Sequence, residues 1–124
     1  MRAAIAATML SVAYQPGAAA TNLMSVEYDA ETDQLIVVIA YRGSHENHVF
    51  TIQWGECRPL GHDRFETYGL LLDSDPTDHA LQEFMTKLEV DMAFNSCRPA
   101  TLTIRTPTGF NRSIEIPAAK VKET

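Results

Sequence analysis

The sequence predicts an all-β protein, an antiparallel β-sandwich of about seven strands with one short helix. Three observations favour this fold class. Apolar residues recur at every second position in most segments after residue 20, as they do in half-buried strands. Turn-forming residues separate these segments at intervals of roughly 8 to 15 residues. Alternating strand and helix patterns are absent, which argues against a parallel α/β sheet.

The N-terminal segment, residues 1–20, is expected to be a signal peptide or a disordered leader. Arg2 precedes an apolar run over 3–13, a Gln-Pro-Gly break follows at 15–17, and alanines occupy 18–20. This order is typical of a secretory signal peptide. The run is much shorter than the roughly 20 residues that a membrane-spanning helix needs, so no membrane span is expected. We therefore predict a periplasmic or secreted protein.

The first half of the expected domain contains three strands. Residues 24–28 alternate between apolar and polar, as in a half-buried strand. Residues 34–42 are almost continuously apolar and β-branched, which is typical of a central strand covered on both faces. Residues 48–54 alternate again, with His48 at the start of the apolar face and Trp54 at its end. Trp54 is therefore predicted to lie in the core.

The second half is predicted to add a short helix and four more strands. In the first of these strands, Gly69 indicates a bulge or a close approach of the backbone. The Asp-Pro pair at 75–76 is a helix-capping pattern, and the expected helix ends at Gln82 or Phe84. The four strands cover 65–72, 87–92, 100–105 and 110–116, and the single domain, 21–117, ends in a frayed tail over 118–124.

The two cysteines, Cys57 and Cys97, are predicted to form a disulfide. They lie forty residues apart, whereas metal and redox sites place cysteines close together in Cys-x-x-Cys motifs. An even number of cysteines behind a leader favours a structural bridge, and two buried free thiols are the alternative. Seven antiparallel strands crossed by one bridge resemble an immunoglobulin-like sandwich in architecture. Small β-sandwiches usually present their loops for binding, so loops are expected to make the contacts.

The charge distribution excludes some partners. The formal net charge is -6, and nucleic-acid binding usually depends on a basic surface, so no nucleic acid is expected. Residues 27–33 and 73–83 each contain four acids and no base, and the residues after Cys97 contain five bases against two acids. Acidic loops of this kind suit a basic protein partner. The chain itself is expected to be a monomer or a weak dimer.

The histidines offer a metal-binding alternative. His45 and His48 lie three residues apart, and His62 and His79 follow further along the chain. Imidazole nitrogens bind zinc and copper, but residues three apart point to opposite faces of an extended strand. No metal or other cofactor is therefore favoured. A site built on His45 and His48, with His62 or His79, stays open as an alternative.

Sequence motifs for catalysis are missing, so no enzymatic activity is predicted. The chain has no Gly-x-Ser-x-Gly elbow, no phosphate-binding glycine loop and no His-Glu-x-x-His motif. We expect a non-catalytic binding module of the bacterial envelope that acts by protein–protein contact, as an inhibitor, immunity protein or escort. A periplasmic transition-metal-binding protein and an unrecognised enzyme are the alternatives. The candidate contact residues are Arg42, Ser44, His45, Glu46, Asn47, Asp73, Asp75 and Asp78.

Overall fold

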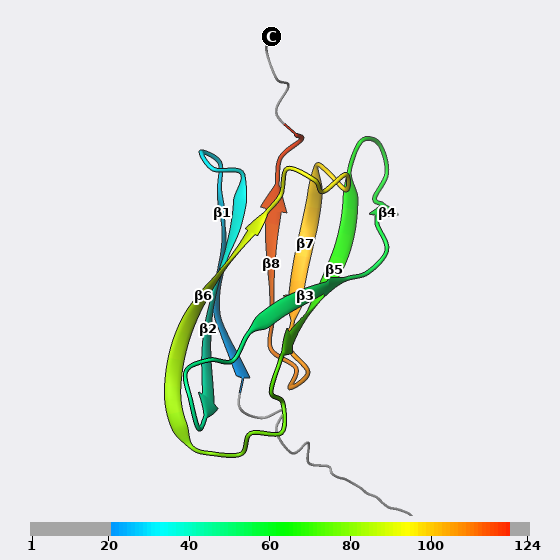
Figure 1. Cartoon of the computed structure of the whole chain (residues 1–124). Helices are drawn as coiled ribbons and strands as arrows, with labels where there is room; N and C mark the ends of the chain where they lie inside the picture. The colour runs from blue at the N-terminus through cyan, green and yellow to red at the C-terminus, as the bar shows by residue number, and fades with distance from the viewer. Residues whose placement is uncertain (1–20, 120–124) are drawn as a thin grey trace, which may run out of the picture.

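The computed structural model describes residues 21–119, which form eight β-strands in two facing sheets (Figure 1). The predicted all-β sandwich is confirmed for this part of the chain. The predicted leader over 1–20 and the tail residues 120–124 lie outside it. The strands are β1 (Thr21–Asp29), β2 (Gln34–Gly43), β3 (Phe50–Trp54), β4 (Arg58–Pro59), β5 (Phe65–Asp73), β6 (Gln82–Asp91), β7 (Ala100–Arg105) and β8 (Asn111–Ile116).

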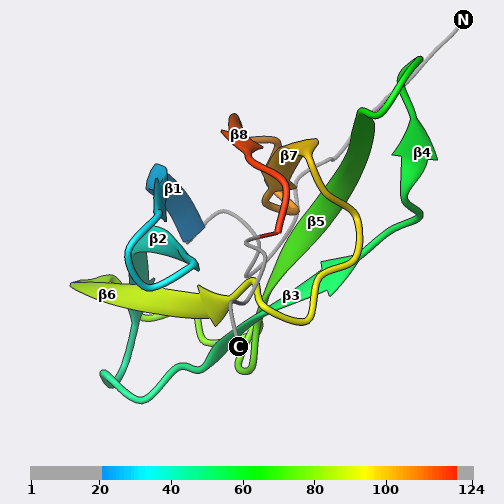
Figure 2. The ribbon, with the colours of Figure 1, turned by 90° about the horizontal axis from the view of Figure 1, so that it is seen from above.

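The smaller sheet has the order β1-β2-β6, and all its strands are antiparallel. The central position of β2 agrees with its apolar composition, but the expected cover on both faces is wrong, because Ile36 and Val38 on the outer face are only half-buried. Leu35, Val37 and Ile39 are buried on the face that looks toward the other sheet. Figure 2 shows this sheet in profile against the layer formed by β3, β5, β7 and β8.

The larger sheet has the order β3-β5-β7-β8, with the short strand β4 also paired to β5. Strands β5 and β7 are parallel, and the other pairs in this sheet are antiparallel. The parallel pair arises because β6 carries the chain back along the opposite sheet before β7 begins. The expectation of a wholly antiparallel sandwich is therefore wrong at this pair, and the immunoglobulin-like topology is not confirmed.

The core lies between the two sheets and follows the predicted alternation. Phe50 is buried, and Ile52 and Trp54 on the same face of β3 are half-buried against the core. Gly69 lies opposite Trp54 in the paired strands. A Cβ at Gly69 would lie 2.5 Å from Ile52 Cγ2 and 3.0 Å from the Trp54 ring. Gly69 is thus a position of close approach, one of the two roles the sequence suggested.

The predicted short helix, from the Asp-Pro pair at 75–76 to Gln82 or Phe84, is wrong, because residues 74–81 form a loop and a strand follows it. Strand β6 begins at Gln82, and its ten residues pair with the whole of β2. Phe84 and Leu88 alternate with exposed residues and pack against the core. Local capping signals were outweighed by this long-range pairing. Residues 21–119 contain no helix that could cross a membrane.

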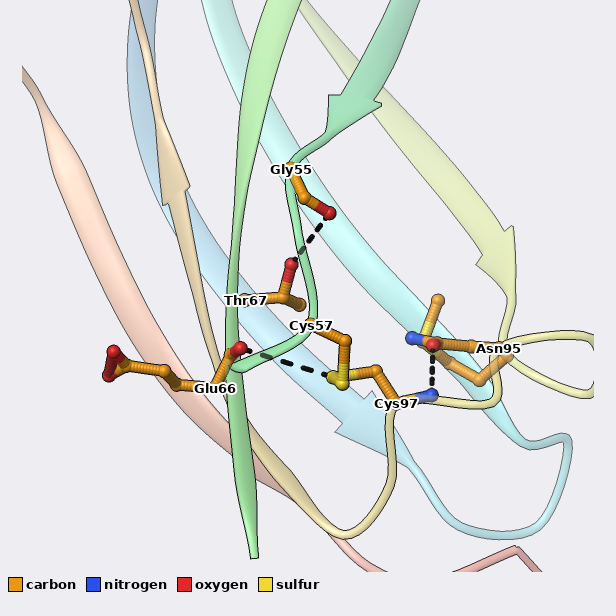
Figure 3. Close-up of a disulfide and its surroundings, with 7 residues drawn as sticks. Gly55, Cys57, Glu66, Thr67, Asn95 and Cys97 are labelled. Carbon is orange, nitrogen blue, oxygen red and sulfur yellow. Dashed lines mark hydrogen bonds between the residues drawn. A yellow bond between two sulfur atoms is a disulfide. The ribbon is translucent and has the colours of Figure 1, made fainter. Parts of the chain in front are cut away.

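The disulfide between Cys57 and Cys97 is confirmed (Figure 3). It joins the segment after β3 to the loop that leads from β6 into β7, with 5.6 Å between the two Cα atoms. The backbone N–H of Cys97 donates to Asn95 Oδ1 at 2.9 Å. The buried Arg98 forms an ion pair with Asp33 at 2.9 Å. These contacts fix the end of the sandwich that follows β6.

Candidate metal centre

The β2–β3 loop (44–49) and the β5–β6 loop (74–81) lie at the same end of the sandwich (Figure 1). Strand pairing brings them together, because Gly43 pairs with Gln82 and Phe50 pairs with Asp73. Two hydrogen bonds join the loops directly. The Val49 N–H donates to Ser74 Oγ at 2.9 Å, and the Ser74 N–H donates to the Val49 carbonyl at 2.9 Å.

His48 lies between two carboxylates at this end. Its Nδ1 donates to Asp73 at 2.8 Å, and its Nε2 donates to Asp78 Oδ2 at 2.9 Å. The imidazole has no exposed surface, and the ring of Tyr41 packs beside it with 4.8 Å between centroids. The sequence placed His48 on the core face of its strand, and the structure adds that both ring nitrogens are satisfied by carboxylates.

The surroundings of this pair shift both pKa values toward the charged forms. Burial by itself lowers the pKa of His48, but the hydrogen bonds with Asp78 and Asp73 outweigh burial, and the net shift is upward. The pKa of Asp78 is held well below its usual range, first by the backbone N–H of Ser44 and then by His48 and the Ser44 hydroxyl. In the metal-free protein, His48 is therefore an imidazolium held between carboxylates over a wider pH range than an isolated histidine.

His45 and Asp75 complete a group of four donor residues with His48 and Asp78. One ligand atom from each, two imidazole nitrogens and two carboxylate oxygens, lies within 4.8 Å of all the others. His45 Nε2 is 3.3 Å from Asp75 Oδ2 and 4.0 Å from Asp78 Oδ2. A tetrahedral ion with bonds of about 2.1 Å spaces its ligand atoms about 3.4 Å apart. Small side-chain rotations therefore suffice to close this group around one ion.

Gly43, the last residue of β2, leaves room for the group. A Cβ at this position would lie 2.6 Å from His48 Nε2 and 2.8 Å from Asp78 Oδ2. Both are the atoms through which these residues would bind a metal. Any larger side chain would push into the centre of the site, so glycine is required here by space and not by backbone conformation.

Outer hydrogen bonds orient the two buried donors. Asp73 accepts the Nδ1–H of His48, which leaves Nε2 as the nitrogen that faces the other donors. Ser44 donates to Asp78 Oδ2 through its backbone N–H at 2.6 Å and through its hydroxyl at 2.9 Å. Carboxylate–histidine–metal arrangements of this kind fix the tautomer and raise the basicity of the ligand. The site thus has both direct donors and the partners that position them.

The structure brings together only part of the histidine set named from the sequence. His45 and His48 meet, whereas His62 lies exposed in the loop before β5 and His79 is exposed outside the group of four. Asp75 and Asp78, expected as protein-contact residues, supply the other two donors. Among the remaining contact candidates, Arg42 pairs with Glu83 at 3.5 Å, and Glu46 and Asn47 are exposed.

Sequence reasoning missed the joint role of the Ser-His-Glu-Asn-His segment and the Asp-Ser-Asp-Pro-Thr-Asp loop. Both segments were identified separately, and each follows a predicted strand. Their meeting depends on the pairing of β3 with β5, which the sequence pattern does not specify. Gly43 by itself did not indicate a binding site, because a glycine at the end of a strand is equally consistent with a turn.

Comparison with known proteins finds no matching family model, no matching curated protein and no matching solved structure. Only the geometry and chemistry of the chain's own residues therefore indicate a function. The His-Asp group is the arrangement among residues 21–119 in which His, Cys, Asp or Glu side chains gather closely enough to hold a metal ion.

Proposed function

We propose that this protein binds one divalent transition-metal ion, with Zn²⁺ the best fit, through His45, His48, Asp75 and Asp78. One observation carries the proposal: four nitrogen and oxygen donors from two loops lie within 4.8 Å of one another. Two imidazoles and two carboxylates without sulfur suit Zn²⁺ and not Cu⁺, which prefers thiolates and thioethers. Ca²⁺ and Mg²⁺ prefer sites made entirely of oxygen.

Binding requires a proton to leave Nε2 of both histidines. In the metal-free protein, His45 Nδ1 accepts the Asn47 N–H, so Nε2 carries the proton that faces Asp75. This proton must move to Nδ1, with loss of the Asn47 bond, before Nε2 can bind a metal.

At His48, the Nε2–H donates to Asp78 in the metal-free protein, and this proton must leave before Nε2 can bind a metal. Asp73 continues to accept the Nδ1–H and holds the ring in place. The carboxylates of Asp75 and Asp78 then balance the two positive charges of the ion. The buried donors are therefore arranged before the metal arrives.

The protein-contact function stays a second proposal, because the same end of the molecule exposes apolar side chains. Val49 is 60% exposed and Leu81 is 75% exposed, and these residues flank the two loops. Loops at one end of a sandwich form the binding surface of immunoglobulin-like domains. A partner that docks on this end would contact the loops and the metal site together. The Cys57–Cys97 disulfide supports a periplasmic or secreted location.

Isothermal titration of chelator-treated protein with Zn²⁺ tests the proposed function. We expect one ion per chain for the wild type and for His62→Ala, which removes an exposed histidine outside the group. Binding should be strongly weakened in His45→Ala and in Asp75→Asn, whose side chains are half-exposed and whose loss should leave the fold intact. Absence of stoichiometric binding by the folded wild type would refute the proposal.

A further inference from the structure

The four donors differ sharply in exposure. The side chains of His48 and Asp78 are 0% and 8% exposed, and we call them the inner pair. The side chains of His45 and Asp75 are 42% and 43% exposed, and we call them the outer pair. An ion held by all four would therefore be enclosed by protein on one side and reached from solvent on the other.

The inner pair is fixed by the fold. Asp73 and Ser44 hold it through the hydrogen bonds described above, and Tyr41 packs against the imidazole of His48. Moving His48 would leave its buried ring nitrogens unsatisfied, and moving Asp78 would break its bonds with Ser44 and remove the partner of His48 Nε2. The inner pair can therefore stay bound to an ion while the outer ligands are exchanged.

The outer pair is not fixed in this way. The imidazole of His45 interacts with Asp75, with the ring of His48 and with the backbone N–H of Asn47, which donates to its Nδ1 at 3.1 Å. Asp75 lies in the connecting loop, and its carboxylate contacts His45. Rotation of either side chain toward solvent would break the partly buried His45–Asp75 hydrogen bond but would leave the contacts of the inner pair with Asp73 and Ser44 in place. One outer ligand can thus leave an ion without disturbing the sandwich.

We expect the fold to be stable without the metal. A continuous core fills the space between the sheets, and the disulfide ties the opposite end. Ser74 and Val49 already join the two loops through their own hydrogen bonds. Structural zinc sites, by contrast, are closed on all sides and supply the folding energy of small domains. This site has neither property.

We infer that the bound ion is exchangeable cargo, handed to an acceptor by ligand exchange at the outer pair. This inference rests on the proposed metal binding. A donor atom of the acceptor approaches from the solvent side and forms a bond to the ion as the bond to His45 breaks. The Asp75 bond exchanges next, and the inner pair releases the ion last, as Nε2 of His48 takes up a proton from solvent and again donates it to Asp78. The ion stays divalent throughout, and no electrons are transferred.

The rate of metal removal tests this inference. Zn²⁺-loaded protein is mixed in a stopped-flow instrument with the chelator 4-(2-pyridylazo)resorcinol at increasing concentrations. We expect the observed rate to rise in proportion to the chelator concentration, because the chelator enters the coordination shell before the ion leaves. A rate that does not depend on chelator concentration would overturn the inference, because release would then be limited by opening of a closed site.

Two further measurements separate the possible failures. In His45→Ala, the Zn²⁺ affinity should fall and transfer to the chelator should become faster, while His62→Ala should match the wild type in both. Near-ultraviolet circular dichroism of the metal-free protein should show the same folded signal as the loaded form. An unfolded metal-free state would contradict the cargo role but not metal binding. If the wild type binds no Zn²⁺ in the titration, both proposals fall.

Discussion

The imidazole of His48 and the carboxylate of Asp73 are joined by a hydrogen bond of 2.8 Å across twenty-five residues of sequence. Asp73 ends β5, and His48 lies two residues before β3, so the pairing of these two strands creates the bond. The bond determines which ring nitrogen faces Asp78 and the outer donors. A contact between two strand ends thereby orients a buried histidine toward the other donors of the proposed metal site.

Replacing Asp73 by alanine should weaken Zn²⁺ binding about 10- to 100-fold, because the orientation and basicity of His48 both depend on this carboxylate. Asp73→Asn keeps an acceptor for the Nδ1–H and should recover part of the loss. Glu46→Gln removes an exposed acid of the neighbouring loop and serves as the matched control. Titration calorimetry of the three variants measures the effect. Equal affinities for Asp73→Ala and Glu46→Gln would show that Asp73 has no positioning role.

Replacing Gly43 by alanine should disturb the site through steric contact with His48 Nε2 and Asp78 Oδ2. Overpacking of this kind costs about 1 to 3 kcal/mol of stability. The comparison variant is Gly55→Ala, where the nearest atom to the added Cβ is a carbonyl oxygen at 3.4 Å. Urea unfolding and Zn²⁺ titration should show a defect in Gly43→Ala alone. Wild-type behaviour of Gly43→Ala would mean that the loops can separate freely.

The stability of the metal-free protein should fall as the pH rises from mildly acidic to alkaline values. The pKa of His48 is raised in the folded state, so its contribution is fully present below the unfolded value of about 6.5 and is lost as the pH rises through the folded value. The groups that face His48 are Asp73, Asp78, His45 and Tyr41.

Asp78 has the opposite sign, since its lowered pKa gives stability that is lost at acidic pH. Urea unfolding in EDTA between about pH 5 and pH 9 measures the His48 effect within the range where Asp78 stays ionised. His48→Gln should flatten the profile, and His62→Gln should not. A wild-type profile that rises toward pH 9 would contradict the described hydrogen bonds.

Removing the disulfide should reduce stability without changing metal affinity. The Cys57→Ser, Cys97→Ser double variant should lose about 2 to 4 kcal/mol in urea unfolding, because the denatured chain is no longer restrained. The bridge and the metal site lie beyond opposite ends of β6, so Zn²⁺ titration should match the wild type. Alkylation of the wild type without reductant, followed by intact mass measurement, should detect no free thiol. Two alkylated cysteines would contradict the bridge.

Much of the fold could be predicted from local sequence patterns, and the parts that failed depend on long-range pairing. The alternation in β3 correctly placed Phe50 and Ile52 toward the core. A local helix-capping pattern led to the prediction of a helix before Phe84. The pairing between β2 and β6 that determines the structure there cannot be seen in a local pattern. The parallel pairing of β5 with β7 was missed for the same reason.

The candidate site could be predicted only in part. His45 and His48 were identified as possible ligands, yet their spacing on an extended strand argued against a joint site. In the structure they lie in a loop, where the two-residue alternation of a strand does not apply, and their ring centroids are 4.8 Å apart. Asp75 and Asp78 were identified in a separate loop. Their approach to the histidines depends on strand order, which an individual sequence does not reveal.

The histidine side-chain ¹H–¹⁵N spectrum, recorded before and after one equivalent of Zn²⁺, tests the metal site most directly. The four imidazoles of the chain report separately, so His62 and His79 act as internal controls. We predict that Nε2 of both His45 and His48 moves to a metal-bound shift, that Nδ1 of His48 stays protonated against Asp73, and that His62 and His79 do not change. Unchanged resonances for His45 and His48, or changes at His62 and His79 instead, would contradict the proposed site.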